Sequence, residues 1–104
     1  MILVTTDSVE GRRITAVLGM VRGNTVRARM FGRDILAGMR GLVGGEVIEY
    51  TKLMAESREQ ALDRMVEEAT NLGADAIVGL RFATSEVMNH AAEVLVYGTA
   101  VRLE

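Results

Sequence analysis

The chain contains no cysteine, proline or tryptophan, and only two phenylalanines and two tyrosines among its 104 residues. Without cysteine it cannot form disulfides, thiolate zinc sites, iron–sulfur clusters or a cysteine nucleophile. No apolar run reaches about 18 residues, so the sequence predicts no membrane span. The first residues, "MILVTTDSVEGRR", lack the basic region of a signal peptide, and we therefore expect a cytoplasmic protein.

Length and composition predict one folded α+β domain over residues 1–104. Residues 1–45 carry seven arginines and three acids, whereas residues 46–104 carry five bases and eleven acids, so net charges of +4 and −6 give the formal −2. A basic half can indicate nucleic-acid binding, but four aromatic residues make a poor base-stacking surface. We expect instead that the two halves complement each other, within one subunit or between subunits.

Short β-branched runs at both ends of the chain predict strands. Their boundaries are 2–6, 12–21 with an extended continuation at 25–30, 74–87, and 92–103. Gly23 and Asn24 indicate a turn or bulge, and the "MNHA" stretch indicates a short hairpin connection between the last two strands.

Between the strands lies "FGRDILAGMRGLVGGE", residues 31–46, which is rich in glycine. It contains no Gly-x-Gly, and Gly45 is followed by an acid rather than by Lys-Ser/Thr, so it does not match a phosphate-binding loop. Its apolar residues recur at helical spacing, which predicts a short helix over 31–43 with a small-residue face. We expect Gly44 and Gly45 to end this helix.

Residues 46–72 predict a long amphipathic helix, because apolar residues recur on one face and five acids lie on the other. Gly73 favours a left-handed cap at its C-terminal end.

Strands 14–21, 76–83 and 94–103 are largely apolar on both faces. One helix covers one sheet face, so the second face predicts a homo-oligomer. The alternative is that the 31–43 helix covers the second face within one subunit.

Few residues suggest chemistry. His90 is the only histidine and no Gly-x-Ser-x-Gly elbow exists, so a Ser-His-Asp triad is not favoured. Met88 and His90, with Glu86 and Glu93 nearby, are weak candidate ligands for copper or zinc, and a solvated hairpin is the favoured interpretation. Asp34, Asp75 and Glu46 could form a carboxylate site, but no pattern brings them together, and Asp75 is expected in the turn after Gly73.

Three stretches, "RDILAGMRGLVGG", "NLGADAIVGLRF" and "YGTAV", together resemble the YbjQ-like family of small bacterial and archaeal proteins. The resemblance runs from "VTT" to "GTAV". It implies a dodecin-like α+β subunit, in which a curved antiparallel sheet packs on one long amphipathic helix plus a shorter Gly-rich helix. It also implies a ring-shaped homo-oligomer, typically a pentamer. The matching residues look architectural: Arg33, Asp34, Gly38, Gly44, Gly45, Gly73, Ala74, Asp75, Gly79 and Gly98.

The family is often labelled heavy-metal-binding, but its biochemical function is not established and no ligand motif transfers to this chain. We therefore favour a ring-forming binding or scaffold module without catalysis, whose cofactor and small ligand are unknown. Two alternatives stay open: a heavy-metal-binding protein that uses Met88 and His90, and an enzyme with a site shared between subunits around Arg33, Asp34 and Asp75.

Overall fold

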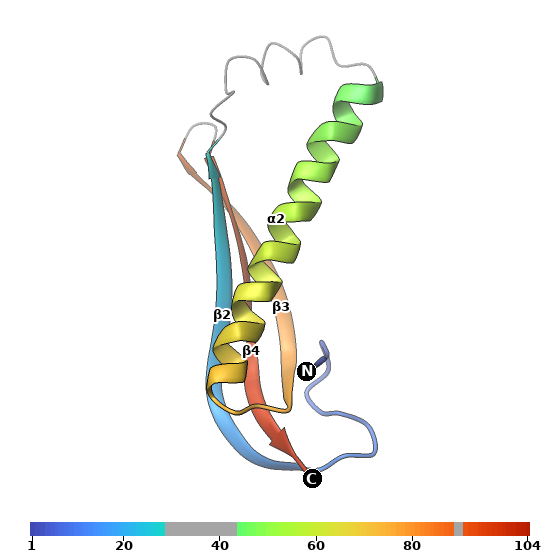
Figure 1. The fold of residues 1–104 in the computed structure, drawn as a ribbon, viewed down its shortest axis with the longest axis vertical. Helices are drawn as coiled ribbons and strands as arrows, with labels where there is room; N and C mark the ends of the chain where they lie inside the picture. The colour runs from blue at the N-terminus through green and yellow to red at the C-terminus, as the bar shows by residue number, and fades with distance from the viewer. Residues whose placement is uncertain (29–43, 89–90) are drawn as a thin grey trace.

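The computed structural model describes residues 1–28, 44–88 and 91–104, which form a four-stranded sheet crossed by one long helix (Figure 1). The elements are β1 (Ile2–Leu3), β2 (Ile14–Ala28), α2 (Gly44–Asn71), β3 (Ala76–Met88) and β4 (Ala91–Leu103). The strand order is β1-β3-β4-β2. Helix α2 packs over β2 and β4 on one side of the sheet, which we call the helix face. The other side is the open face.

The predicted α+β class is confirmed, but the prediction of an antiparallel sheet is wrong for one strand. β2 and β3 run antiparallel to β4, whereas β1 runs parallel to β3. The Ile2 N–H donates to the Asp75 carbonyl and the Val4 N–H to the Ile77 carbonyl, at 3.2 and 3.0 Å. Parallel pairing needs a long crossover, and the chain supplies one by passing through β2 and α2 between these two strands.

β2 is one continuous strand of 15 residues, so the predicted turn or bulge at Gly23 and Asn24 is wrong. The register shifts lie nearer the start of the strand, where Gly19 has a φ of +119°. Gly23 instead allows close approach of α2. A Cβ at this position would overlap the Ala61 carbonyl oxygen and lie 2.6 Å from the Met65 backbone nitrogen.

The predicted long helix is confirmed as α2, with Ala61, Met65 and Ala69 fully buried at a spacing of four residues. Gly73 follows the helix with a φ of +78°, as expected for a left-handed cap. Gly44 and Gly45 are the first residues of α2, which begins two residues before the prediction. The helix predicted over 31–43 lies outside the described residues. No helix in the described part of the chain is long and apolar enough to cross a membrane.

Each face of the sheet has its own apolar core. The helix-face core contains α2 residues together with Val21, Ile77, Leu80, Val94, Val96 and Ala100. The open-face core is smaller and consists of Ala76, Val78, Val101 and Leu103, packed against Ile2, Val4, Val9 and Ile14. The segment before β2 therefore covers one end of the open face. This cover was not predicted from the sequence, because Ile2, Leu3 and Val4 are all apolar and do not show which face they meet.

Candidate functional site

The two weak metal candidates are at the β3–β4 hairpin. Met88 is the last residue of β3 and pairs with Ala91, but its side chain, like all of His90, lies outside the described part of the structure. The two carboxylates of the same stretch do not converge. Glu86 pairs with Ala92 and Glu93 pairs with Ser85, so the carboxylates lie on opposite faces of the sheet.

The Glu93 carboxylate is already engaged, because the Asn24 side-chain amide donates to it at 3.0 Å. Across residues 1–28, 44–88 and 91–104 no group of three His, Asp or Glu side chains could hold a metal ion. The prediction for Met88 and His90 itself stays untested.

Asp75 has a structural contact rather than an open carboxylate. It precedes β3 in the bend after Gly73, as predicted, and its Oδ2 accepts the Leu103 backbone N–H at 2.9 Å. Its own N–H donates to the Val101 carbonyl at 2.9 Å. Arg33 and Asp34, which were expected to join Asp75 in a shared site, lie outside the described residues. The Asp75 side chain connects the start of β3 to the end of β4.

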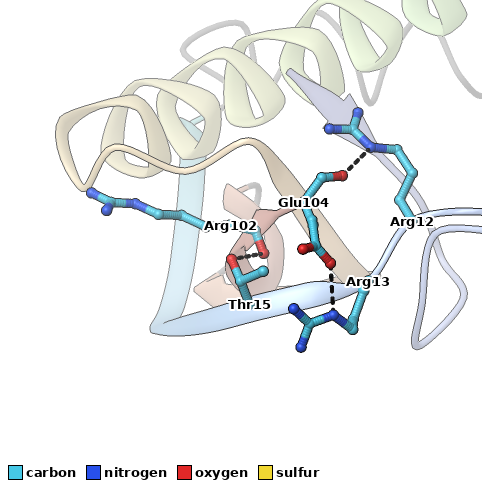
Figure 2. A network of polar contacts seen from close by, with 5 residues as sticks. All are labelled: Arg12, Arg13, Thr15, Arg102 and Glu104. Carbon is cyan, nitrogen blue, oxygen red and sulfur yellow. Dashed lines mark hydrogen bonds and ion pairs between the residues drawn. The ribbon is translucent and has the colours of Figure 1, made fainter.

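Arginines gather where the chain end meets the start of β2 (Figure 2). Arg13 Nε and Glu104 Oε2 form an ion pair at 2.7 Å, and Arg12 Nε donates to the Glu104 carbonyl at 3.1 Å. The hydrogen bond to Glu104 raises the pKa of Arg13. Both partners are largely exposed, and the cluster ties Glu104 to the residues that precede β2.

The most distinctive surface of the described chain is an uncovered strip along the edge strand β2. On the open face, Val17, Met20 and Val26 are 68%, 63% and 54% exposed. Arg22 lies on the same face, between Met20 and Val26 in the sequence. It pairs with the half-exposed Tyr97 of the neighbouring strand β4. We call Val17, Met20, Arg22 and Val26 the β2 strip. Large apolar side chains exposed together in this way indicate an association surface.

A second uncovered strip lies on the other face and near the other edge of the sheet. Phe82 pairs with Val96, which is buried beneath α2, so Phe82 belongs to the helix face. Helix α2 packs on β2 and β4, and Phe82 is left 44% exposed. Thr84 and Glu86 follow on the same face and are also exposed. We call Phe82, Thr84 and Glu86 the β3 strip.

Comparison with known proteins identifies the family. The family model described as "Putative heavy-metal-binding", YbjQ, matches residues 1–104. The chain belongs to this family. The predicted resemblance is thereby confirmed, while the metal described for the YbjQ family has no ligand cluster among the described side chains of this member.

Relatives of similar length occur in archaea and bacteria, each named "UPF0145 protein". One from Thermus thermophilus is 59% identical over 104 residues, covering 99% of this chain and 91% of the relative. One from Methanosarcina acetivorans is 54% identical over 103 residues, covering 99% and 97%. One from Vibrio campbellii is 50% identical over 103 residues, covering 99% of each chain. None of these names states a reaction, which agrees with the expectation that the function is unknown.

A solved structure shares the fold of this YbjQ family member. It is the crystal structure of a protein of unknown function from Pediococcus pentosaceus, assigned to the DUF74 family. The TM-score is 0.67 at 18% identity, and the match covers 100% of this chain and 98% of the other. At that identity the likeness concerns the fold alone.

Proposed function

We propose that this YbjQ family member is a homo-oligomeric, ring-forming module that binds a small ligand or serves as a scaffold, without catalysis. The supporting observation is its shape. The Cα radius of gyration is 17.1 Å, and the principal extents are 54 × 24 × 17 Å. A compact domain of 104 residues has a radius of gyration of about 13 Å. The elongated shape exposes more surface than a compact monomer of this length, and this surplus supports an oligomer.

The solvent-accessible surface area also supports an oligomer. The accessible surface of the single chain is 6882 Å². A compact monomer of 11.3 kDa exposes about 5,700 Å². The surplus of roughly 1,200 Å² falls between one and two times the ~800 Å² that each partner buries in a standard interface. A subunit with one neighbour on each side would bury an area of this order.

The finer parts of the proposal follow from the family resemblance. They are a dodecin-like subunit with a second, shorter Gly-rich helix, a pentameric ring, and a cytoplasmic location. The uncovered part of the open face would meet neighbouring subunits. Catalysis is not part of the proposal. The described carboxylates with assigned partners are Asp75, Glu93 and Glu104, which contact a backbone amide, Asn24 and Arg13.

The deciding experiment is native mass spectrometry at micromolar concentration, on protein purified without added metal or chelator. We expect a closed oligomer of defined subunit number, and light scattering should return the same mass in solution. A monomer at tens of micromolar would overturn the proposal. Any additional mass on the oligomer would identify the ligand class directly, and cell fractionation would test the cytoplasmic location.

Heavy-metal binding is a second candidate, and the observation that favours it is the description of the matching family model. Metal content per subunit should be measured after loading with copper or zinc and desalting. In this candidate, Met88→Leu and His90→Ala each lower the stoichiometry, whereas Met54→Leu, a methionine packed against the core, leaves it unchanged. Equal metal content in all four proteins would remove the hairpin as the site.

A further inference from the structure

The two uncovered strips are complementary in position. The β2 strip lies on the open face of the edge strand β2, and the β3 strip lies on the helix face of β3. β4 separates β2 from β3 in the sheet, so one chain cannot bring its own two strips together. A second copy of the chain can bring its β3 strip against the β2 strip of the first.

They are also complementary in chemistry. Each strip combines exposed apolar surface with one charge. The β2 strip has Val17, Met20 and Val26 beside Arg22, and the β3 strip has Phe82 beside Glu86. Among the described residues neither Arg22 nor Glu86 has a hydrogen-bond or ion-pair partner, although most other described arginines do. A charge that enters an interface needs a partner of opposite sign, because desolvation without one is costly.

We propose that the β2 strip of one copy packs against the β3 strip of the next copy, with Arg22 of one subunit facing Glu86 of its neighbour. The inference rests on the proposed function, since it needs an oligomer, and it goes further by assigning the interface. Val26 lies four residues from Arg22, and Phe82 lies four residues from Glu86, so Val26 would meet Phe82 where the two strands run in opposite directions.

The arrangement explains why the assembly would close into a ring. A two-fold dimer through the β2 strip alone would bring Arg22 toward Arg22, and a dimer through the β3 strip would bring Glu86 toward Glu86. Like charges in an interface disfavour both. Contact between two different surfaces of the same chain is heterologous, and repetition of such a contact gives a closed ring when the rotation permits.

A charge-reversal cycle on the full chain tests the assignment. Arg22→Glu and Glu86→Arg should each raise the subunit concentration at which the assembly half-dissociates by roughly tenfold or more, since like charges then meet across every interface. The double variant Arg22→Glu/Glu86→Arg restores opposite charges and should recover most of that loss. Arg58→Glu reverses an exposed charge on α2, outside both strips, and should leave dissociation unchanged.

The readouts are native mass spectrometry over a dilution series and circular dichroism, which confirms that each variant is folded. Phe82→Ser provides a second test without a charge change and should also weaken assembly. A wild-type monomer would overturn the proposed function together with this inference. A wild-type oligomer that tolerates both single reversals, or a double variant no better than the singles, would overturn the interface assignment and leave the oligomer intact.

Discussion

The contact between Gly23 and α2 is the tightest point of the core, and Gly23→Ala should weaken the fold markedly. Gly23 has an ordinary φ, so an alanine costs nothing in backbone conformation. The added Cβ would overlap the Ala61 carbonyl oxygen and lie 2.6 Å from the Met65 nitrogen. Both neighbours are backbone atoms of a helix and cannot rotate away. The helix must therefore move from the strand.

The size of the effect follows from that displacement. Returning the Met65 contact from 2.6 Å to an ordinary 3.4 Å requires a movement of at least about 0.8 Å. Such a shift loosens the packing of the buried residues on α2 and lengthens the buried bond from Thr25 Oγ1 to the Ser57 carbonyl, now 3.2 Å. Overpacking a well-filled core costs about 1–3 kcal/mol, and a clash with backbone belongs at the upper end. For a domain of this size, 3 kcal/mol lowers Tm by more than about 10 °C.

The assay is thermal and urea unfolding followed by circular dichroism, with every variant at one protein concentration because association contributes to stability. Gly11→Ala is the control, since Gly11 has a φ of +76° and a Cβ there meets nothing within 4 Å. It should cost only the strain of a left-handed residue, about 1–2 kcal/mol. If Gly23→Ala were as stable as the wild type, the close approach of α2 to β2 would be refuted.

Three further substitutions have distinct expected outcomes. Gly98→Ala places a Cβ 2.6 Å from Ile77 Cγ2 and 3.0 Å from the Val78 carbonyl oxygen, and should cost about 2 kcal/mol by urea midpoint. The loss should be smaller than for Gly23→Ala, because the closest neighbour of Gly98 is a side-chain atom and that of Gly23 is a backbone atom of α2. Asp75→Ala leaves the Leu103 N–H without its acceptor and should lower the free energy of unfolding by about 1–3 kcal/mol. Asp75→Asn keeps an acceptor oxygen and should recover part of this loss, so equal losses in the two variants would contradict the assignment. Arg13→Ala removes an exposed ion pair and should leave Tm unchanged within error; a loss as large as that of Asp75→Ala would contradict the weak-pair reasoning.

Much of the fold could be predicted because periodicity and caps are local signals. The spacing of Ala61, Met65 and Ala69 and the glycine at 73 placed α2 to within two residues at its start and one at its end. Gly23 was misread for a physical reason. A glycine in an apolar strand marks either a bulge or a close approach, and only the position of α2 distinguishes them. The parallel pairing of β1 was missed because two-residue strands carry no signal for a partner.

The candidate surfaces were harder to predict than the fold. Alternation correctly assigned an apolar second face to the sheet, but it did not show that Ile2, Val4 and Val9 cover one end of it. Nor did it show that the helix face of β3 is exposed at Phe82, Thr84 and Glu86, because the path of a helix across a sheet is set by tertiary packing at points such as Gly23.

The charge asymmetry between the two halves also has a structural reading. Within the described residues a single ion pair joins them, between Arg13 and Glu104. Arg64, Arg81 and Arg102 instead donate to backbone carbonyls of Asn24, Thr5 and Gly73, where they fasten loops and strands but neutralise no acid. Complementarity inside one subunit is therefore slight in the part of the chain that the structure describes. Described acids without a partner among the described residues, such as Glu86, are available to a neighbouring subunit. Arg22 is the described arginine best placed to contact such an acid, because it lies on an uncovered apolar surface.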